Sequence, residues 1–193
     1  MPGFWIRAVV AAIVLPLCIV TMTSLPPNRS LRAQEPRTSG LLEVNDLLPR
    51  MTGEALSGRS LEIPSAMSGT PTVILFSFSN EGGRDARRWA ERIGDQADSM
   101  KGTDVVYVLE MQAVPRLIRS VVALGIKRGV PPAVRDRMLV LDRDDALWRR
   151  RLGVTTTDRS YAVLVGADGR IRWMSHAEFS DAEFERLRAV LRT

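Results

Sequence analysis

The stretch PTVILFSFSNEGGRDARRWAERI, residues 71–93, predicts a buried strand, a tight turn and a helix in immediate succession. Residues 71–79 form a continuous apolar run, which is typical of a central strand covered on both faces. The helix is expected to begin at Gly82-Gly83 and to run to about Met100. Its apolar residues recur at helical spacing: Ala86, Trp89, Ala90, Ile93 and Ala97. One strand and one covering helix therefore form the centre of the expected fold.

The rest of the globular part continues the alternation of strands and helices. Strands are expected at 60–63, 103–111 and 137–142. A helix is expected from Pro115 to near Gly129, and a second, short helix from a cap at Asp142 or Asp144 to Gly153. Parallel crossovers of this kind predict an α/β domain, residues 41–193, with helices on both faces of the sheet.

The C-terminal part reads as a hairpin followed by a helix. SYAVLVGADGRIRWMS, residues 160–175, places Asp168-Gly169 between two β-rich runs, so Gly169 is expected at positive φ. The hairpin should bury Val163, Val165 and Ile171. Ser180 and Glu183 form a capping-box pattern for a last helix, which should bury Phe184, Leu187, Val190 and Leu191. The antiparallel hairpin makes the expected sheet a mixed one.

The N-terminal part has a different composition. Residues 1–25 place Arg7 before a run of about 17 mostly apolar residues. This predicts a signal peptide or a membrane anchor, and an extracytoplasmic domain that is periplasmic or secreted. Ala33 is a plausible residue before a cleavage site, but it lies well beyond the apolar run, so both readings stay open. Residues 26–40 are rich in Pro, Ser and Arg and are expected to form a tether.

Charge and the single cysteine exclude several functions. The formal net charge is +5, yet most arginines alternate with acids along predicted helices, as on solvated helix faces. The one dense cluster is Arg149-Arg150-Arg151, and no nucleic-acid recognition motif accompanies it, so no nucleic-acid partner is expected. Cys18 is the only cysteine and lies in the apolar segment. A dithiol and a disulfide are therefore impossible within residues 19–193.

No motif indicates another catalytic centre. Asp142, Asp144 and Asp145 lack the further oxygen ligands that a hard-cation loop needs, and helix capping explains them. His176 is the only histidine and has no evident catalytic partner. Glu81 at the helix tip would repel a phosphate. The sequence thus predicts no metal, no cofactor and no enzymatic activity.

Two passages resemble periplasmic redoxins of the peroxiredoxin and thiol-disulfide interchange type: residues 58–78 and residues 147–173. The resemblance implies a thioredoxin-like three-layer sandwich. In its register the Cys-x-x-Cys positions hold Glu81, Gly82, Gly83 and Arg84, and the companion cis-proline falls at Ser160. The resemblance therefore implies the fold of a redoxin without its thiol chemistry.

A narrower set of residues is similar to the mitochondrial ATP-synthase assembly-factor family, whose members are thioredoxin-like proteins of the inner membrane. The similarity lies in FSFSN with Ala86 and Trp89, PRLIRSVV, Trp148 with Leu152-Gly153, and GRIRW at 169–173. Met174-Ser175-His176 departs from the Gly-x-Gly that the family often has after this tryptophan. The similarity implies a binding role and a mitochondrial inner-membrane location as an alternative.

The expected function is that of a redox-inactive binding or assembly factor near a membrane, with a protein partner. Two alternatives stay open: a redoxin relative that acts through a partner's thiols, and a structural subunit of an envelope complex. Because the groove beside the cis-proline binds extended peptides in active relatives, the expected partner site is this edge. It comprises Asn80, Glu81, Gly82, Gly83, Arg84, Ser160, Tyr161 and Trp173, and the side of Trp148 and Trp173 is the next candidate.

Overall fold

The structure, a computed structural model, describes residues 40–192 apart from 68, 97, 99, 101, 112, 113 and 142. In this part of the chain seven strands form one mixed sheet, in the order β2-β1-β5-β4-β3-β6-β7. Neighbours β3, β4 and β5 are parallel, and all other pairs are antiparallel. The strands are β1 Met51–Ala55, β2 Ser60–Ile63, β3 Thr72–Ser77, β4 Asp104–Glu110, β5 Met138–Leu141, β6 Tyr161–Val165 and β7 Ile171–Ser175. The α/β class with a mixed sheet is confirmed.

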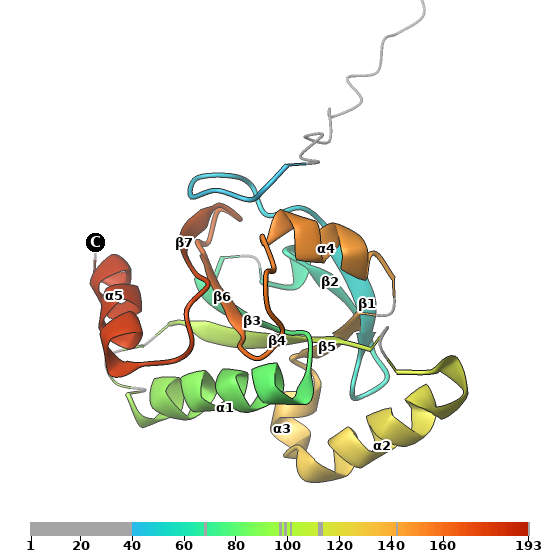
Figure 1. The fold of residues 1–193 in the computed structure, drawn as a ribbon. Helices are drawn as coiled ribbons and strands as arrows, with labels where there is room; N and C mark the ends of the chain where they lie inside the picture. The colour runs from blue at the N-terminus through green and yellow to red at the C-terminus, as the bar shows by residue number, and fades with distance from the viewer. Residues whose placement is uncertain are drawn as a thin grey trace, which may run out of the picture. The chain divides into compact units, whose positions relative to one another are not determined.

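Helices cover both faces of the sheet (Figure 1). The helix α1 (Asn80–Asp95) packs on the same face as α5 (Asp181–Leu191), and α4 (Asp145–Arg151) packs on the other. The helices α2 (Arg119–Gly129) and α3 (Pro132–Arg135) connect β4 to β5, with a 3-10 turn Arg116–Ile118 before α2. These are the three layers that the sequence predicts.

The sheet separates two apolar cores, because successive side chains of a strand point to opposite faces. All six residues of β3 are buried. Val73 and Leu75 pack with Trp89 and Phe184 beneath α1 and α5. Ile74 and Phe76 belong to the second core, in which Trp148 of α4 also packs. The continuous apolar run at 71–79 thus reflects a strand with both faces covered.

The hairpin is confirmed in detail. Gly169 has φ of +79°, and the Gly169 amide donates to the Gly166 carbonyl across the turn. Val163, Val165 and Ile171 are buried.

Ser180 caps α5 by accepting a hydrogen bond from the Glu183 amide. The Glu183 carboxylate accepts from the Ser175 hydroxyl at 2.8 Å and so joins α5 to β7. In α5, Phe184 and Leu187 are buried, whereas Val190 and Leu191 are partly buried.

Four local expectations differ from the structure. Residues 51–55, where the sequence predicts no strand, form β1, because this strand pairs with both β2 and β5. The first helix begins at Asn80, since Ser79 supplies its cap, and it ends at Asp95. The short helix Pro132–Arg135 lies where the sequence predicts only the end of a helix. Asp144 stands at the start of α4 with φ of +60° and makes no side-chain cap hydrogen bond.

Three expectations fall on residues that the structure does not describe: the signal peptide or anchor at 1–25, nearly all of the tether at 26–40, and Asp142 as a cap. Among the described residues, none of the helices combines the length and the apolar character that a membrane crossing requires.

Candidate functional site

The first turn of α1 occupies the place where the resemblance to redoxins puts a redox centre. Ser79 is the cap of this helix, and its hydroxyl oxygen accepts a hydrogen bond from the Gly82 amide at 3.1 Å. Glu81, Gly82, Gly83 and Arg84 are therefore helical residues rather than a turn before the helix. The positive end of the helix dipole meets a hydroxyl and a carboxylate here, and neither can take part in thiol exchange.

The loop 154–160, which leads into β6, closes directly over this first turn. The Ser79 hydroxyl donates to the Thr157 carbonyl at 2.5 Å. Gly82 packs against the same loop: a Cβ atom at this position would lie 2.8 Å from the Arg159 carbonyl oxygen and 3.1 Å from the Thr157 carbonyl oxygen. Gly82 is therefore required for the close approach of the chain's own backbone, and it is buried.

Asp85 is the main polar link between α1 and this loop. Its side chain is fully buried, and its carboxylate accepts from the Ser160 amide at 3.0 Å and from the Ser160 hydroxyl at 2.6 Å. The same carboxylate accepts from the Phe179 amide at 2.9 Å and pairs with Arg88 at 2.8 Å. One carboxylate thus ties the helix to the start of β6 and to the segment before α5.

Tyr161 stabilises the loop from its other end. Its hydroxyl donates to the Thr156 carbonyl at 2.9 Å and accepts from the Thr155 and Thr156 amides. Tyr161 and Ser160 are buried. We call the residues 79–85 together with the loop 154–160 the α1 edge. Gly82 and Ser160 within it, and Tyr161 directly after it, hold the backbone in place and offer no surface to a partner.

The exposed members of the predicted site are Asn80, Glu81 and Arg84. Arg84 donates to the Glu81 carboxylate at 2.8 Å, one helical turn apart. A hydrogen bond from a backbone amide, and then the charge of Arg84, lower the pKa of Glu81. The carboxylate therefore stays ionised, and this corner of the molecule presents one negative and one positive group side by side.

A hollow of about 430 Å³ begins beside this exposed corner, at Gly83. Its wall includes Ala86 and Ala90 of α1, Tyr107 of β4 and Val130 after α2. Burial raises the pKa of Tyr107, so its hydroxyl stays protonated at neutral pH. The charged corner at Glu81 and Arg84 thus adjoins a mostly apolar recess.

The two tryptophans that the sequence suggests as partner contacts lie elsewhere. Trp173 is half-buried in the core beneath α1, with its ring 5.8 Å from that of Trp89, and it is not part of the α1 edge. Trp148 is 2% exposed and stacks on Phe76 at 5.6 Å. Trp148 as a partner contact is therefore wrong, because it lies inside the second core.

The remaining candidates have structural roles. Arg149 pairs with the buried Glu110 at 2.8 Å and Arg151 lies over the Trp148 ring, so two of the three arginines in the cluster make internal contacts. His176 lies beside the Tyr161 ring, and burial lowers the pKa of its imidazole. Within the described ranges, no group of three or more acidic, histidine or cysteine side chains could hold a metal ion.

Asp85 is the residue that sequence reasoning missed. It lies four residues before Trp89 and eight before Ile93, which places it on the buried stripe of the helix. A carboxylate on such a stripe must be hydrogen-bonded inside the fold. That spacing is the signal that could have identified it.

Solved structures confirm the thioredoxin-like fold. The thioredoxin domain of a thiol-disulfide oxidoreductase from Bacteroides vulgatus is 17% identical, covers 77% of this chain and 99% of its own, and has a TM-score of 0.53. A thiol peroxidase from Chromobacterium violaceum is 13% identical. The match covers 79% of this chain and 90% of the peroxidase chain, with a TM-score of 0.51. The peroxidoxin BcpB from Mycobacterium tuberculosis is 15% identical. The match covers 78% of this chain and 97% of the peroxidoxin chain, with a TM-score of 0.51. At these identities the likeness establishes the fold alone.

The family comparison agrees with the narrower resemblance seen in the sequence. No curated protein matches the chain. The family described as "ATP10 protein" matches residues 45–193, which is nearly the whole of the described domain. The chain therefore belongs to the ATP10 protein family.

Proposed function

We propose that this chain is a redox-inactive assembly factor that binds a protein subunit of a membrane complex. The observation that carries the proposal is the α1 edge, where a redoxin fold keeps its helix start but has Glu81 and Arg84 at the positions of the two reactive thiols. Since residues 19–193 contain no cysteine, the fold can contribute binding but no thiol exchange.

Membership in the ATP10 family supports a partner from an ATP synthase. The family also supports a mitochondrial inner-membrane setting, and the apolar composition of residues 1–25 supports a domain held near a membrane. We propose this membrane-proximal setting, with the bacterial envelope as the corresponding location in a bacterial source.

The partner surface that we propose is the exposed corner of the α1 edge together with the adjoining hollow. Asn80, Glu81 and Arg84 offer hydrogen bonds and opposed charges, and the hollow that begins at Gly83 offers apolar contact. Gly82, Ser160 and Tyr161 support this surface from beneath. Complementary charges of this kind contribute specificity more than affinity. Trp173 is a second candidate contact.

The test is a charge reversal, Glu81→Arg with Arg84→Glu, in the full chain. A matched control reverses the exposed pair Arg59 and Asp136, 3.5 Å apart on another part of the surface. Cross-linking in the native membrane followed by mass spectrometry measures the recovery of ATP-synthase subunits, and thermal melting checks the fold. We expect the Glu81/Arg84 variant to fold like the wild type and to lose most of the recovery, while the control keeps it.

Undiminished recovery by a well-folded Glu81/Arg84 variant would contradict this surface. Trp173→Ala, measured in the same way, then tests the second candidate. Stoichiometric co-purification with the finished complex would instead identify a structural subunit.

A further inference from the structure

The helix α2 differs from the other long helices because it has no buried residue. Four of the large apolar side chains that the described part of the chain exposes lie on α2 and the 3-10 turn before it: Leu117, Ile118, Val121 and Leu124. We call these four residues the α2 face. Leu117 is 94% exposed and Val121 is 67% exposed. A contiguous apolar patch of this kind marks an interaction surface.

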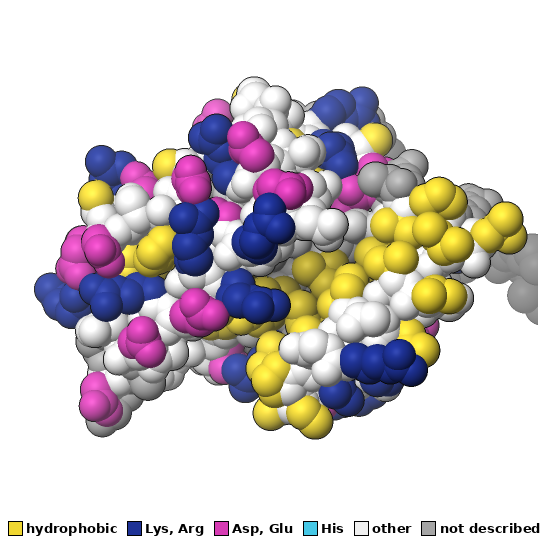
Figure 2. All heavy atoms as spheres, turned by 60° about the horizontal axis from the view of Figure 1, so that its bottom comes forward, with side chains coloured by type: hydrophobic (Ala, Val, Ile, Leu, Met, Phe, Trp, Pro, Cys, Tyr) yellow, Lys and Arg dark blue, Asp and Glu magenta, His cyan; other side chains and the backbone are white. Residues whose placement is uncertain are grey.

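The exposed apolar residues of the α2 face lie close together in the sequence. Val121 and Leu124 lie three residues apart on α2 and so share one side of the helix. Leu117 and Ile118 precede them in the 3-10 turn. Figure 2 shows yellow apolar side chains gathered on the right half of this view, whereas most magenta acidic side chains lie on the left half.

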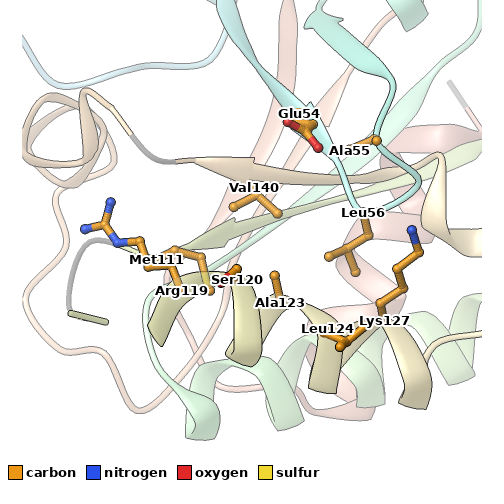
Figure 3. Close-up of a pocket in the computed structure, with 11 residues that line it drawn as sticks. Glu54, Ala55, Leu56, Met111, Arg119, Ser120, Ala123, Leu124, Lys127 and Val140 are labelled. Atoms are coloured by element: carbon orange, nitrogen blue, oxygen red, sulfur yellow. The ribbon is translucent and has the colours of Figure 1, made fainter. Parts of the chain in front are cut away.

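Beneath α2 lies a hollow of about 480 Å³ rather than a packed interface. Figure 3 shows the side chains that border it, among them Leu56 after β1, Val140 of β5 and Leu124 of α2. Lys127 and Glu54 border the same hollow from opposite sides. A hollow therefore separates much of the helix from the sheet, with Ala123 and Leu124 at its border, and no residue of α2 is fully buried.

The charge of the chain is concentrated on this same segment. Residues 111–135 contain five basic residues and no acidic residue: Arg116, Arg119, Lys127, Arg128 and Arg135. The chain has 27 basic and 22 acidic residues, so removing this segment leaves 22 of each and a net charge of zero. Arg119 and Arg135 donate to the Val114 and Val130 carbonyls within the segment. The whole net charge of +5 thus belongs to the segment that carries the α2 face.

We propose that the α2 face binds the surface of an anionic lipid bilayer. Its apolar side chains enter the boundary between headgroups and acyl chains, and Lys127 and Arg128 contact the lipid phosphates. Interfacial helices bind membranes by this combination of apolar burial and attraction to anionic lipid. This inference goes beyond the proposed function, because it concerns a lipid surface rather than the protein partner.

The test uses an environment-sensitive probe on the full chain. Cys18→Ser removes the native thiol, and Val121→Cys then carries an NBD fluorophore on the α2 face. A control chain carries the same probe at Ala182→Cys, an exposed position of α5. Each chain is added to vesicles of phosphatidylcholine alone or of phosphatidylcholine mixed with phosphatidylglycerol. We expect a blue shift of the emission at position 121 in the mixed vesicles, and none at position 182.

Charge dependence is measured in two ways. Raising the salt to about 1 M, where the screening length falls to about 3 Å, should weaken the shift strongly. Lys127→Glu with Arg128→Glu should abolish it, whereas the equal change of net charge in Arg150→Glu with Arg192→Glu, at exposed residues outside the segment, should leave it intact. Circular dichroism shows that each variant is folded.

Three results would overturn the proposal. The first is a water-like emission at position 121 in the mixed vesicles, which would leave an acidic apolar protein segment as the occupant of the α2 face. The second is an equal shift at position 182. The third is an equal loss of the shift in the Arg150/Arg192 control.

Discussion

The α1 edge and the α2 face lie on two helices of one fold and differ in how the chain itself covers them. At the α1 edge, the loop 154–160 closes on the helix through Ser79, Gly82 and Asp85. At the α2 face, a hollow lies beneath the helix and four large apolar side chains are exposed. The place where the resemblance to redoxins puts a redox centre is thus closed here by internal contacts, and the exposed apolar side chains lie on α2 and the turn before it.

This difference predicts which substitutions change the stability of the fold and which change only binding. Buried polar groups with several partners are costly to disturb, whereas exposed apolar groups can be replaced at little cost to folding. Substitutions at the buried residues of the α1 edge should therefore lower stability. Substitutions on the α2 face should leave stability unchanged.

The largest effect is expected for Asp85→Ala. The buried amide and hydroxyl of Ser160 and the partly buried amide of Phe179 would lose their acceptor, so we expect a loss of about 3–5 kcal/mol in the free energy of unfolding. Urea denaturation measures it. Asp136→Ala breaks only the exposed pair with Arg59 and serves as the control, within about 0.5 kcal/mol of the wild type. Equal stabilities for the two variants would contradict the role assigned to Asp85.

Two adjacent glycines provide the next comparison. Gly82→Ala would place a Cβ atom against the Arg159 carbonyl, and we expect a cost of about 1–3 kcal/mol. Gly83→Ala meets no atom within 4 Å and should stabilise the helix by about 0.5–1 kcal/mol. Thermal melting of the two variants should therefore give shifts of opposite sign. Shifts of the same sign would mean that the loop does not pack on Gly82.

The smallest effect is expected on the α2 face. Val121→Ala should change the free energy of unfolding by no more than about 0.5 kcal/mol, because Val121 is already in water. Ile93→Ala, at a buried position of α1, should cost about 2–5 kcal/mol. Urea denaturation measures the free energy of unfolding of both variants. A large loss of stability for Val121→Ala would show that the Val121 side chain is packed inside the domain.

The sequence predicts those parts of the fold that depend on local patterns. The run at 71–79, the Asp168-Gly169 turn and the Ser180 cap each give a signal within a few residues, and the structure confirms each of them. β1 was missed because MTGEA lacks an apolar run and is held by its pairing with two strands distant in the sequence.

The candidate site was less predictable, because burial at the α1 edge depends on contacts across about 75 residues of sequence. Asp85 and Ser160 meet only after β6 has joined the sheet, so no local pattern reveals that Ser160 and Gly82 are covered. The exposure of the α2 face is likewise a tertiary property. PRLIRSVV predicts a helix but does not indicate which of its sides the sheet covers.

The most direct test of the central claim, that the redoxin fold here works without thiol chemistry, compares the full wild-type chain with Cys18→Ser in insulin reduction and peroxide consumption. Because residues 19–193 contain no cysteine, both chains should match a heat-denatured control in both assays. Turnover by the Cys18→Ser chain clearly above that control would contradict the account.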